Sequence, residues 1–231
     1  MSDRRLVSII VPVLDEEQAI TGLLDHLAAL PGRLEVIVAD GGSGDATCEL
    51  AAEHPSQPRV VQALAGRARQ MNAGAAVARG EALLFLHADT RLPLDASASV
   101  MAALTRPAIL GGNFALRFDG GDSFSRLLGG WYALQRRAGV YYGDSAIWLR
   151  RTAFEELGGF RPLAIMEDYD LARRLQRAGR TLCLAGPAVT SARRWRQLGL
   201  PRTIASWIAI RWLFLAGVPP HRLIRLYPHV R

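Results

Sequence analysis

The sequence predicts an α/β protein with a doubly wound, mostly parallel sheet and a helical C-terminal extension. Strand-like and helix-like segments alternate over about the first ninety residues, an order that builds parallel sheets with helices on both faces. The strand-like segments are continuous apolar runs, as expected of strands buried on both faces. Beyond residue 200, an apolar segment interrupted by arginine predicts the extension.

Four strands and three helices are expected in the first half of the chain. Pro31 and Gly32 end the first helix, and Pro55 ends the second. Gly80 is expected to stop the third helix, as the residue that follows its C-cap. The predicted strands cover residues 6–13, 34–39, 59–64 and 82–87, and the predicted helices cover 16–30, 46–53 and 69–79.

The second half alternates less regularly, and glycines end two of its helices. Helices are predicted over residues 94–104, 124–138, 151–157 and 168–178, and strands over 109–118, 145–149 and 181–185. No low-complexity linker divides the chain. We therefore expect one catalytic domain over residues 1–200 and a basic, hydrophobic helical tail over 201–231.

Charge is unevenly distributed along the 231 residues. All 28 basic residues are arginines, and residues 171–231 hold 12 of them with no acidic residue. Binding of an anion, either a diphosphate or an anionic lipid surface, accounts for this asymmetry. Cys48 and Cys183 are expected to be free thiols, and the start of the chain has no signal-peptide pattern. A cytoplasmic location is predicted, and peripheral contact with the inner face of the membrane is an open alternative.

Two carboxylates follow apolar strands directly or nearly so. Asp40 ends the second strand, and Asp89 comes shortly after the fourth, two residues beyond His87. The carboxyl ends of parallel strands form the ligand crevice of an open α/β sheet. A carboxylate there can bind a nucleoside, or a divalent cation such as Mg²⁺ or Mn²⁺ that bridges a diphosphate.

The loop after Asp40 has a second reading as a helix cap. Ser43 or Asp45 could cap the 46–53 helix, which would leave Asp40 as the ligand candidate. The chain contains neither the G-x-G-x-x-G fingerprint of dinucleotide-binding folds nor the G-x-x-x-x-G-K-[ST] phosphate loop.

A third acidic group, Glu167-Asp168-Tyr169-Asp170, opens an amphipathic helix. Acids in a first turn are favoured by the helix dipole, so capping alone could explain them. A carboxylate held there could also act as general base on an acceptor hydroxyl. Gly143 and Asp144, just before a short strand, offer a further polar contact on the acceptor side.

These motifs, in this order, resemble the family 2 glycosyltransferases with the GT-A fold. The resemblance covers about residues 6–180. It is carried by SIIVPVLDEE at 8–17, VADGGSGDAT at 38–47, GRARQMNAG at 66–74 with ARGE at 78–81, HAD at 87–89, and FEELGGF at 154–160 with EDYDL at 167–171.

The resemblance implies an inverting, metal-dependent transfer from a nucleotide-diphospho-sugar, usually linked to UDP, to a hydroxyl acceptor. Asp168, with Glu167, would be catalytic, and Asp89 would bind the divalent metal, Mn²⁺ or Mg²⁺. Gly143 and Asp144 would lie on the acceptor side. The implied contacts to the nucleotide-sugar are Pro12, Glu16, Asp40, Arg67, Arg69, Asn72, His87, Arg193 and Arg194.

Two departures from the family pattern concern the metal. Gly41 stands where the D-D-G-S segment has its second Asp, and His87 stands where the D-x-D segment has its first. Asp89 is then the one metal-binding carboxylate that the pattern supplies. The H-A-D-T and S-A-R-R-W strings are similar to a compact bacterial subgroup, the radical-SAM/selenodomain-associated transferases linked to arsenosugar-type pathways.

Two rival functions stay open at this point. A sugar-phosphate nucleotidyltransferase would usually carry an early G-x-G-[TS]-x-x-R loop, which the chain lacks. The second rival is a degenerate GT-A domain that binds a membrane surface. Gly41 and His87, which replace acidic residues of the family pattern, give it some weight.

The tail has more than one reading. Arg193 and Arg194 could close over the diphosphate, whereas no basic face for nucleic acid runs through the rest of the chain. The apolar helix expected over 203–218 contains Arg211 and is too short to span a bilayer. Contact with a membrane surface, contact with a second copy in a homodimer, and burial against the catalytic domain are the three alternatives.

Overall fold

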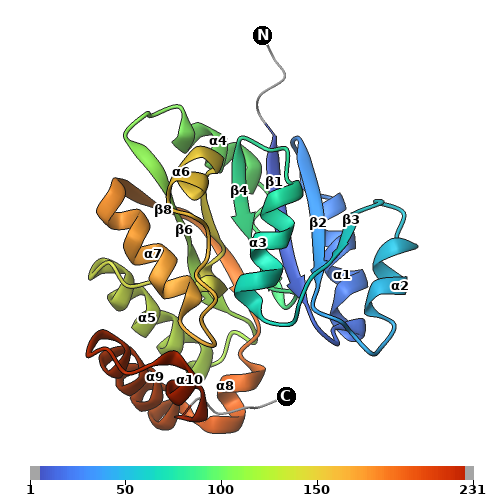
Figure 1. The fold of residues 1–231 in the computed structure, drawn as a ribbon. Helices are drawn as coiled ribbons and strands as arrows, with labels where there is room; N and C mark the ends of the chain where they lie inside the picture. Colours follow the sequence, from blue (N-terminus) through green and yellow to red (C-terminus); the bar gives the residue numbers. More distant parts are fainter. Residues whose placement is uncertain (1–5, 227–231) are drawn as a thin grey trace.

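One curled sheet organises the molecule. The computed structural model describes residues 6–226, apart from the side chains of residues 194, 197 and 198. Within these residues, eight strands form a single sheet in the order β3-β2-β1-β4-β7-β6-β8-β5 (Figure 1). Helices cover both faces of this sheet, so the predicted fold class is confirmed.

The parallel half of the sheet comes from the first ninety residues, as expected. Its strands are β1 (Val7–Val13), β2 (Leu34–Asp40), β3 (Arg59–Gln62) and β4 (Ala82–Phe85), joined by α1 (Glu17–Ala28), α2 (Thr47–Ala52) and α3 (Arg67–Val77). Val13 pairs with Asp40, and Asp40 pairs with Gln62, so these three strands end at one edge of the sheet. Loops that follow them are therefore neighbours.

The second half of the sheet is mixed. Its strands are β5 (Thr90–Arg91), β6 (Ile109–Phe118), β7 (Ile147–Arg150) and β8 (Arg180–Thr190). β7 runs antiparallel to β4 and β6, whereas β6 and β8 are parallel. A Cβ at Gly112 would lie 1.8 Å from the carbonyl oxygen of Leu182, so only glycine permits the close approach of β6 and β8.

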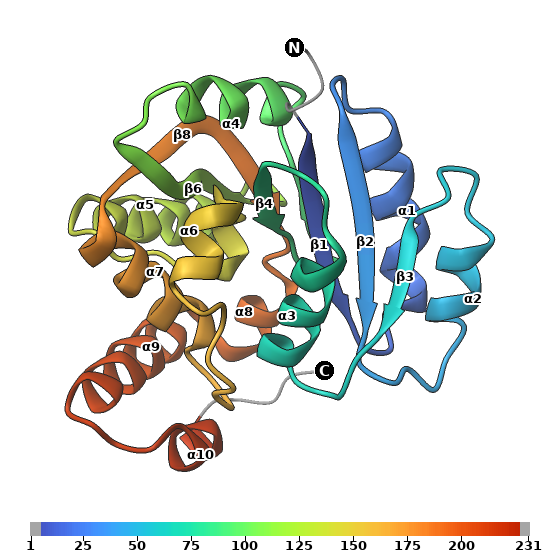
Figure 2. The ribbon, with the colours of Figure 1, turned by 45° about the horizontal axis from the view of Figure 1, so that its top comes forward.

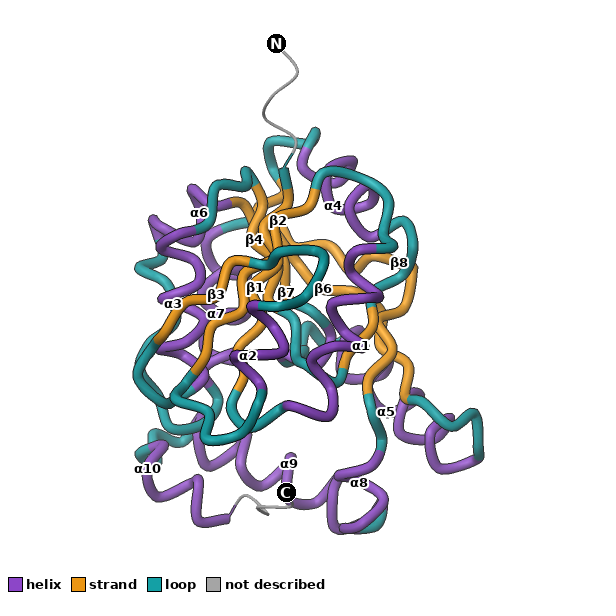
Figure 3. The backbone as a smooth tube through the Cα atoms, turned by 90° about the vertical axis from the view of Figure 1, so that its right-hand side faces the viewer, coloured by secondary structure: helices purple, strands orange, loops and turns teal. Residues whose placement is uncertain are grey.

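Two apolar clusters lie on opposite faces of the sheet. On one face, α1 and α4 (Ala96–Leu104) bury residues that include Leu23, Leu24 and Val100. On the other, α3, α6 (Arg151–Glu156) and α7 (Glu167–Ala178) bury residues that include Met71 and Phe154. Figure 2 and Figure 3 show the strands between these two helical layers.

The C-terminal helices gather at the carboxyl edge of the sheet. These are α8 (Arg193–Leu198), α9 (Leu200–Leu215) and α10 (Pro220–Leu223), followed by the 3₁₀ turn η2 (Ile224–Leu226). Figure 1 shows them at the bottom, toward which β1 and β2 point. Trp207 of α9 packs edge-on against Tyr132 of α5 (Ser123–Arg137), with ring centroids 5.2 Å apart. No helix in the described part of the chain is long and apolar enough to cross a membrane.

Several expected boundaries were wrong. β8 extends from Arg180 to Thr190 instead of ending near residue 185, because its pairing with β6 resumes after a bulge: Leu184 pairs with Phe114, Pro187 pairs with Ala115, and Ala185 and Gly186 lie between them. The third helix ends at a C-cap of Ala78, and Gly80 instead allows close contact with the backbone of β1, since a Cβ there would lie 2.6 Å from Ser8 N. β5, α8 and α10 were not predicted.

Candidate active site

A cavity of about 530 Å³ opens at the carboxyl edge of the sheet. Loops after β1 and β4, the start of α3, the head of α7 and the C-terminal helices all contribute to its walls. Eight of the predicted site residues line it: Pro12, Glu16, Arg67, His87, Asp89, Asp144, Glu167 and Asp168. The sheet thus brings together side chains that are spread over more than half of the chain.

Asp168 is held at the meeting point of three segments. Its Oδ2 accepts a hydrogen bond of 2.7 Å from the backbone N–H of Gly143, in the 3₁₀ turn η1 (Gly143–Ser145). Its Oδ1 accepts from the N–H of Tyr169 at 2.6 Å. A Cβ on residue 143 would lie 2.9 Å from His87 Nε2 and 3.2 Å from Asp168 Oδ2. Glycine is therefore required at 143 for these three residues to meet.

Asp144 is a buried acid in the same cavity. Its Oδ2 accepts a hydrogen bond of 2.5 Å from the hydroxyl of Tyr132, while its Oδ1 is buried with no hydrogen-bond partner among the described atoms. Burial, together with the nearby charges of Asp168 and Asp89, raises the pKa of Asp144 to about 7, although the hydrogen bond from Tyr132 acts against this rise. The neighbouring carboxylates of Asp168 and Asp89 therefore oppose the ionisation of Asp144.

Glu167 shows the same effect. Burial raises its pKa, and the charge of Asp168 adds to the rise, whereas the guanidinium of Arg67 lowers it. Arg67 also lowers the pKa of Asp144. Arg67 at the start of α3 is therefore the cation that partly balances this acidic cluster, which consists of Asp89, Asp144, Glu167 and Asp168.

The raised pKa of Asp144 predicts a dependence of stability on pH. Its ordinary pKa is 3.8, so between pH 4 and 7 the folded protein binds a proton that the unfolded chain has released. The free energy of unfolding therefore falls as pH rises through this window. Asp144→Asn should remove this penalty and stabilise the protein at pH 8, by up to about 4 kcal/mol, and by little at pH 4.5.

Urea unfolding of both proteins at pH 4.5 and 8, with EDTA present, measures the difference. Asp95→Asn, at an exposed position that does not line the cavity, is the control. It should show the wild-type dependence of stability on pH. Equal pH dependence in wild type and Asp144→Asn would contradict the assignment.

Backbone strain gathers around the cavity. Four non-glycine residues in the described chain have positive φ, and three flank this site: Asp15 at 55°, Ala146 at 51° and Met166 at 69°. Met166 precedes the first turn of α7 and lines the cavity. Such conformations cost about 1–3 kcal/mol each and persist where the surrounding fold enforces them. They are often found at functional sites.

Asp40 does not face the cavity. It is 1% exposed, and its carboxylate accepts hydrogen bonds from the backbone N–H of Gly42 and from the N–H and hydroxyl of Ser43. Ser43 therefore supports this loop, and of the two capping candidates it is Asp45 that accepts a hydrogen bond, of 3.0 Å, from the N–H of Thr47 at the start of α2. The buried Gln70 ties the ends of β1 and β2 together by donating to the carbonyls of Val13 and Ala39.

Four further predicted residues, Arg69, Asn72, Gly143 and Arg193, are not among the described residues that line the cavity. Asn72 donates to the carbonyl of Phe160 at 2.8 Å and accepts from its N–H, so it joins α3 to the loop before α7. Arg69 and Arg193 have exposed side chains. The side chain of Arg194 lies outside the described residues.

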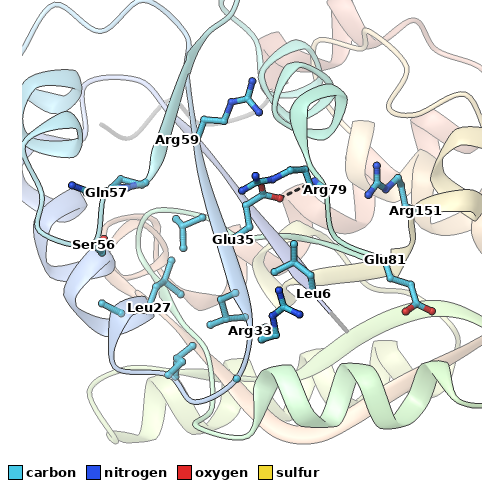
Figure 4. Close-up of a pocket in the computed structure, with 16 residues that line it drawn as sticks. Leu6, Leu27, Arg33, Glu35, Ser56, Gln57, Arg59, Arg79, Glu81 and Arg151 are labelled. Carbon is cyan, nitrogen blue, oxygen red and sulfur yellow. Dashed lines mark hydrogen bonds and ion pairs between the residues drawn. The ribbon is translucent and has the colours of Figure 1, made fainter. Parts of the chain in front are cut away.

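A larger groove of about 1080 Å³ lies at the opposite edge of the sheet. Figure 4 shows four arginines, Arg33, Arg59, Arg79 and Arg151, around Glu35, which pairs with Arg79 at 2.7 Å. None of the predicted site residues lies there. The acidic cluster and the motif residues therefore assign the candidate active site to the smaller cavity.

The donor set of the smaller cavity suits a hard divalent cation. Asp89 supplies a carboxylate, and repulsion within the acidic cluster is a cost that a cation would relieve. Among the described residues, no group of three or more His, Cys, Asp or Glu side chains is arranged to hold a metal ion by itself. The residues therefore fit a cation that takes its remaining ligands from a bound diphosphate.

Comparison with known families places the chain. The model of glycosyl transferase family 2 matches residues 8–161, which include β1, the Asp40 loop, α3 and the Asp89 segment. The chain belongs to glycosyl transferase family 2. No curated protein sequence matches this family 2 chain.

Solved structures agree with the family at the level of the fold. A structure of Staphylococcus aureus TarS, residues 1–349, gives a TM-score of 0.66 at 19% identity and covers 90% of this chain and 65% of that one. The mannosyltransferase PcManGT from Pyrobaculum calidifontis, in complex with GDP-Man and Mn²⁺, gives 0.64 at 24% identity, over 82% and 57%. Glucosyl-3-phosphoglycerate synthase from Mycobacterium tuberculosis, with Mn²⁺ and UDP, gives 0.63 at 21% identity, over 93% and 81%.

The chain spans less than two thirds of the length of the first structures matched, 36% of one TarS chain and 57% of PcManGT. At these identities the likeness concerns the fold alone.

Sequence reasoning missed the side chains that support the acidic cluster. Tyr132, which holds Asp144, lies in the middle of α5, a helix with no motif. Trp195, Trp207 and Ile210 also line the cavity. For Trp207 and Ile210 this is the burial against the catalytic domain that the sequence left as one of three alternatives for the tail. A local signal was absent in each case, because tertiary packing alone brings these residues to the site.

Proposed function

We propose that this family 2 chain is an inverting, metal-dependent glycosyltransferase of the hexosyltransferase kind. It would move a sugar from a nucleotide-diphospho-sugar, with UDP as the nucleotide, to an acceptor hydroxyl. The observation that carries the proposal is the meeting of Asp168, Gly143 and His87 beside Asp89 at the carboxyl edge of the sheet. The UDP, UDP-GlcNAc, GDP-Man and Mn²⁺ complexes among the similar structures support it.

Asp168 is the proposed general base. Its carboxylate would accept the proton of the acceptor hydroxyl while the hydroxyl oxygen bonds to the anomeric carbon. The bond from that carbon to the diphosphate oxygen would break in the same displacement, so the nucleoside diphosphate leaves and the anomeric configuration inverts. The two N–H donors on Asp168 hold its oxygens in place.

Asp89 is the proposed metal ligand, together with the donor diphosphate. A divalent cation bound there supplies neutralisation of charge on the leaving group. Pro12, Glu16, Arg67 and His87 would contact the donor from the cavity wall. Asp40, Arg69, Asn72, Arg193 and Arg194 stay donor-side proposals that rest on the resemblance alone, as do the acceptor-side role of Asp144 and the division of the chain at residue 200.

Calorimetric titration with UDP, with and without Mn²⁺, tests the proposal. We expect binding that Mn²⁺ strengthens, and weaker binding in Asp40→Ala than in the exposed control Asp95→Ala. Absence of UDP binding at millimolar nucleotide under both conditions would sink the transferase reading. UDP binding without any transfer from a panel of UDP-sugars would favour the degenerate binding domain instead. The family match already favours a transferase over a sugar-phosphate nucleotidyltransferase.

We also propose a peripheral contact between the tail and an anionic lipid surface, at the cytoplasmic face of the membrane. Trp212 is 61% exposed and Leu226 is 55% exposed, near the exposed arginines Arg222 and Arg225. Apolar anchors beside basic side chains favour an anionic interface. The radical-SAM/selenodomain-associated subgroup stays a proposal from the sequence.

Liposome flotation tests the lipid contact. The full chain should float with vesicles that contain phosphatidylglycerol and less with pure phosphatidylcholine, and Trp212→Ser should reduce flotation more than Leu94→Ser, an exposed control in another segment. Concentration-dependent dimerisation without flotation would assign this face to a second copy of the chain.

A further inference from the structure

The lining of the cavity contains two chemically different groups of residues. One group is the acidic cluster with Arg67 and His87, which the proposed transfer uses. The other group is an apolar wall, formed by Leu163, Ile165, Trp195, Trp207, Ile210 and Ile224. All six lie beyond residue 161, where the match to the family model ends. The wall is therefore a feature of this chain's own C-terminal part.

The lining residues that the structure describes beyond residue 170 carry no charge. Residues 171–231 contain 12 arginines and no acid, yet the described lining residues from that region are Thr190, Ser191, Trp195, Trp207, Ile210 and Ile224. A wall that bound phosphate would use the arginines that are available. The described wall instead presents apolar side chains to the cavity.

The wall packs against the residues that support the acidic cluster. Trp207 packs edge-on against Trp195 at 4.4 Å and against Tyr132 at 5.2 Å, and Tyr132 in turn holds Asp144. Ile210 packs with Met166 and Tyr169, on either side of Glu167 and Asp168. A molecule that contacts the wall would therefore also lie next to the proposed base.

The exposed part of the wall is aliphatic. Trp195 is 8% exposed and Trp207 is 9% exposed, so neither offers an open ring face on which a sugar could stack. Leu163, Ile165 and Ile224 are only partly buried and present alkyl groups to the cavity. Alkyl groups of this kind gain free energy by covering apolar surface of a ligand.

We propose that the acceptor carries its reacting hydroxyl on an apolar, alkyl-like body, and that the apolar wall is the subsite for that body. The inference rests on the proposed transfer, since it names the acceptor class of the same site. The hydroxyl would reach Asp168, and the alkyl part would lie along Leu163, Ile165 and Ile224. A strongly polar acceptor such as a free sugar or a sugar phosphate would gain nothing from this wall.

A homologous series of primary alcohols, from 1-butanol to 1-octanol, tests the subsite in the presence of saturating UDP and Mn²⁺. Trp195 and Trp207 provide an internal fluorescence signal. Each added methylene buries one more CH₂, so the dissociation constant should fall about fourfold per methylene until the wall is filled. The same alcohols should become better acceptors in the same order when a UDP-sugar is supplied.

Ile224→Asn and Ile165→Asn should flatten this chain-length dependence while UDP binding stays as in wild type. Leu94→Asn, at an exposed position outside the cavity, should leave the chain-length dependence and UDP binding unchanged. The same control reveals any general denaturation of the protein by the alcohols. Alcohol affinity that does not depend on chain length, or tighter binding of methyl β-D-glucoside than of 1-octanol, would overturn the inference while UDP binding still supports the transferase. If the wild-type protein does not bind UDP, the proposed function is overturned, and the acceptor assignment falls with it.

Discussion

Asp168→Asn should lower the turnover number by about 10²–10⁴-fold, the usual contribution of a general base, and leave the affinity for UDP unchanged. Asn keeps the shape of Asp, and its oxygen can still accept the hydrogen bond from the N–H of Gly143. It cannot take up a proton from the acceptor hydroxyl. The substitution therefore separates the chemistry of the base from its packing.

The matched control for this variant is Asp95→Asn, which removes a carboxylate of the same size from an exposed position. Both variants are compared by calorimetry with UDP and by single-turnover transfer. Because Asp168 raises the pKa of Glu167 and Asp144, its removal should not destabilise the fold at pH 8. A variant that keeps more than a tenth of wild-type turnover would show that another group accepts the proton.

The central strands were predictable because burial on both faces leaves a direct trace in the sequence. β2 and β6 match their predicted ranges within one residue. β8 was expected to end near residue 185, and only its pairing with β6 shows that the strand continues beyond a bulge at Ala185 and Gly186. Local rules describe a strand well until a neighbouring strand overrides them.

The candidate site divides in the same way. Asp89, Asp168 and Gly143 could be selected because a motif or a strand end marks each of them. The fold brings Asp89 and Asp168 to the cavity, and the N–H of Gly143 donates a hydrogen bond to Asp168. The inward turn of Asp40 onto its own loop was not foreseen, since a strand-end carboxylate carries no sign of which way it points. Tyr132 and the apolar wall depend on how α5 and α9 pack, which no spacing along the chain encodes.

Asp89→Asn should abolish the strengthening of UDP binding by Mn²⁺ and lower turnover by about 10³-fold, consistent with several kcal/mol of charge stabilisation from a metal. The described residues hold no group of three metal-binding side chains, so the affinity for Mn²⁺ without UDP should already be weak in the wild type. EDTA should reduce wild-type UDP affinity to that of the variant. Retention of the Mn²⁺ effect in Asp89→Asn would refute the metal assignment.

His87 offers the complementary change. It lies against Gly143, close to Asp168, and replaces the first Asp of the family's D-x-D segment. His87→Asp would add a second carboxylate near Asp89 and should tighten Mn²⁺ binding, because hard divalent cations prefer carboxylate oxygen. Calorimetry of Mn²⁺ with the UDP-bound protein compares the two variants directly. If Asp89→Asn weakens the metal and His87→Asp strengthens it, the histidine lowers metal affinity at a site that still depends on Asp89.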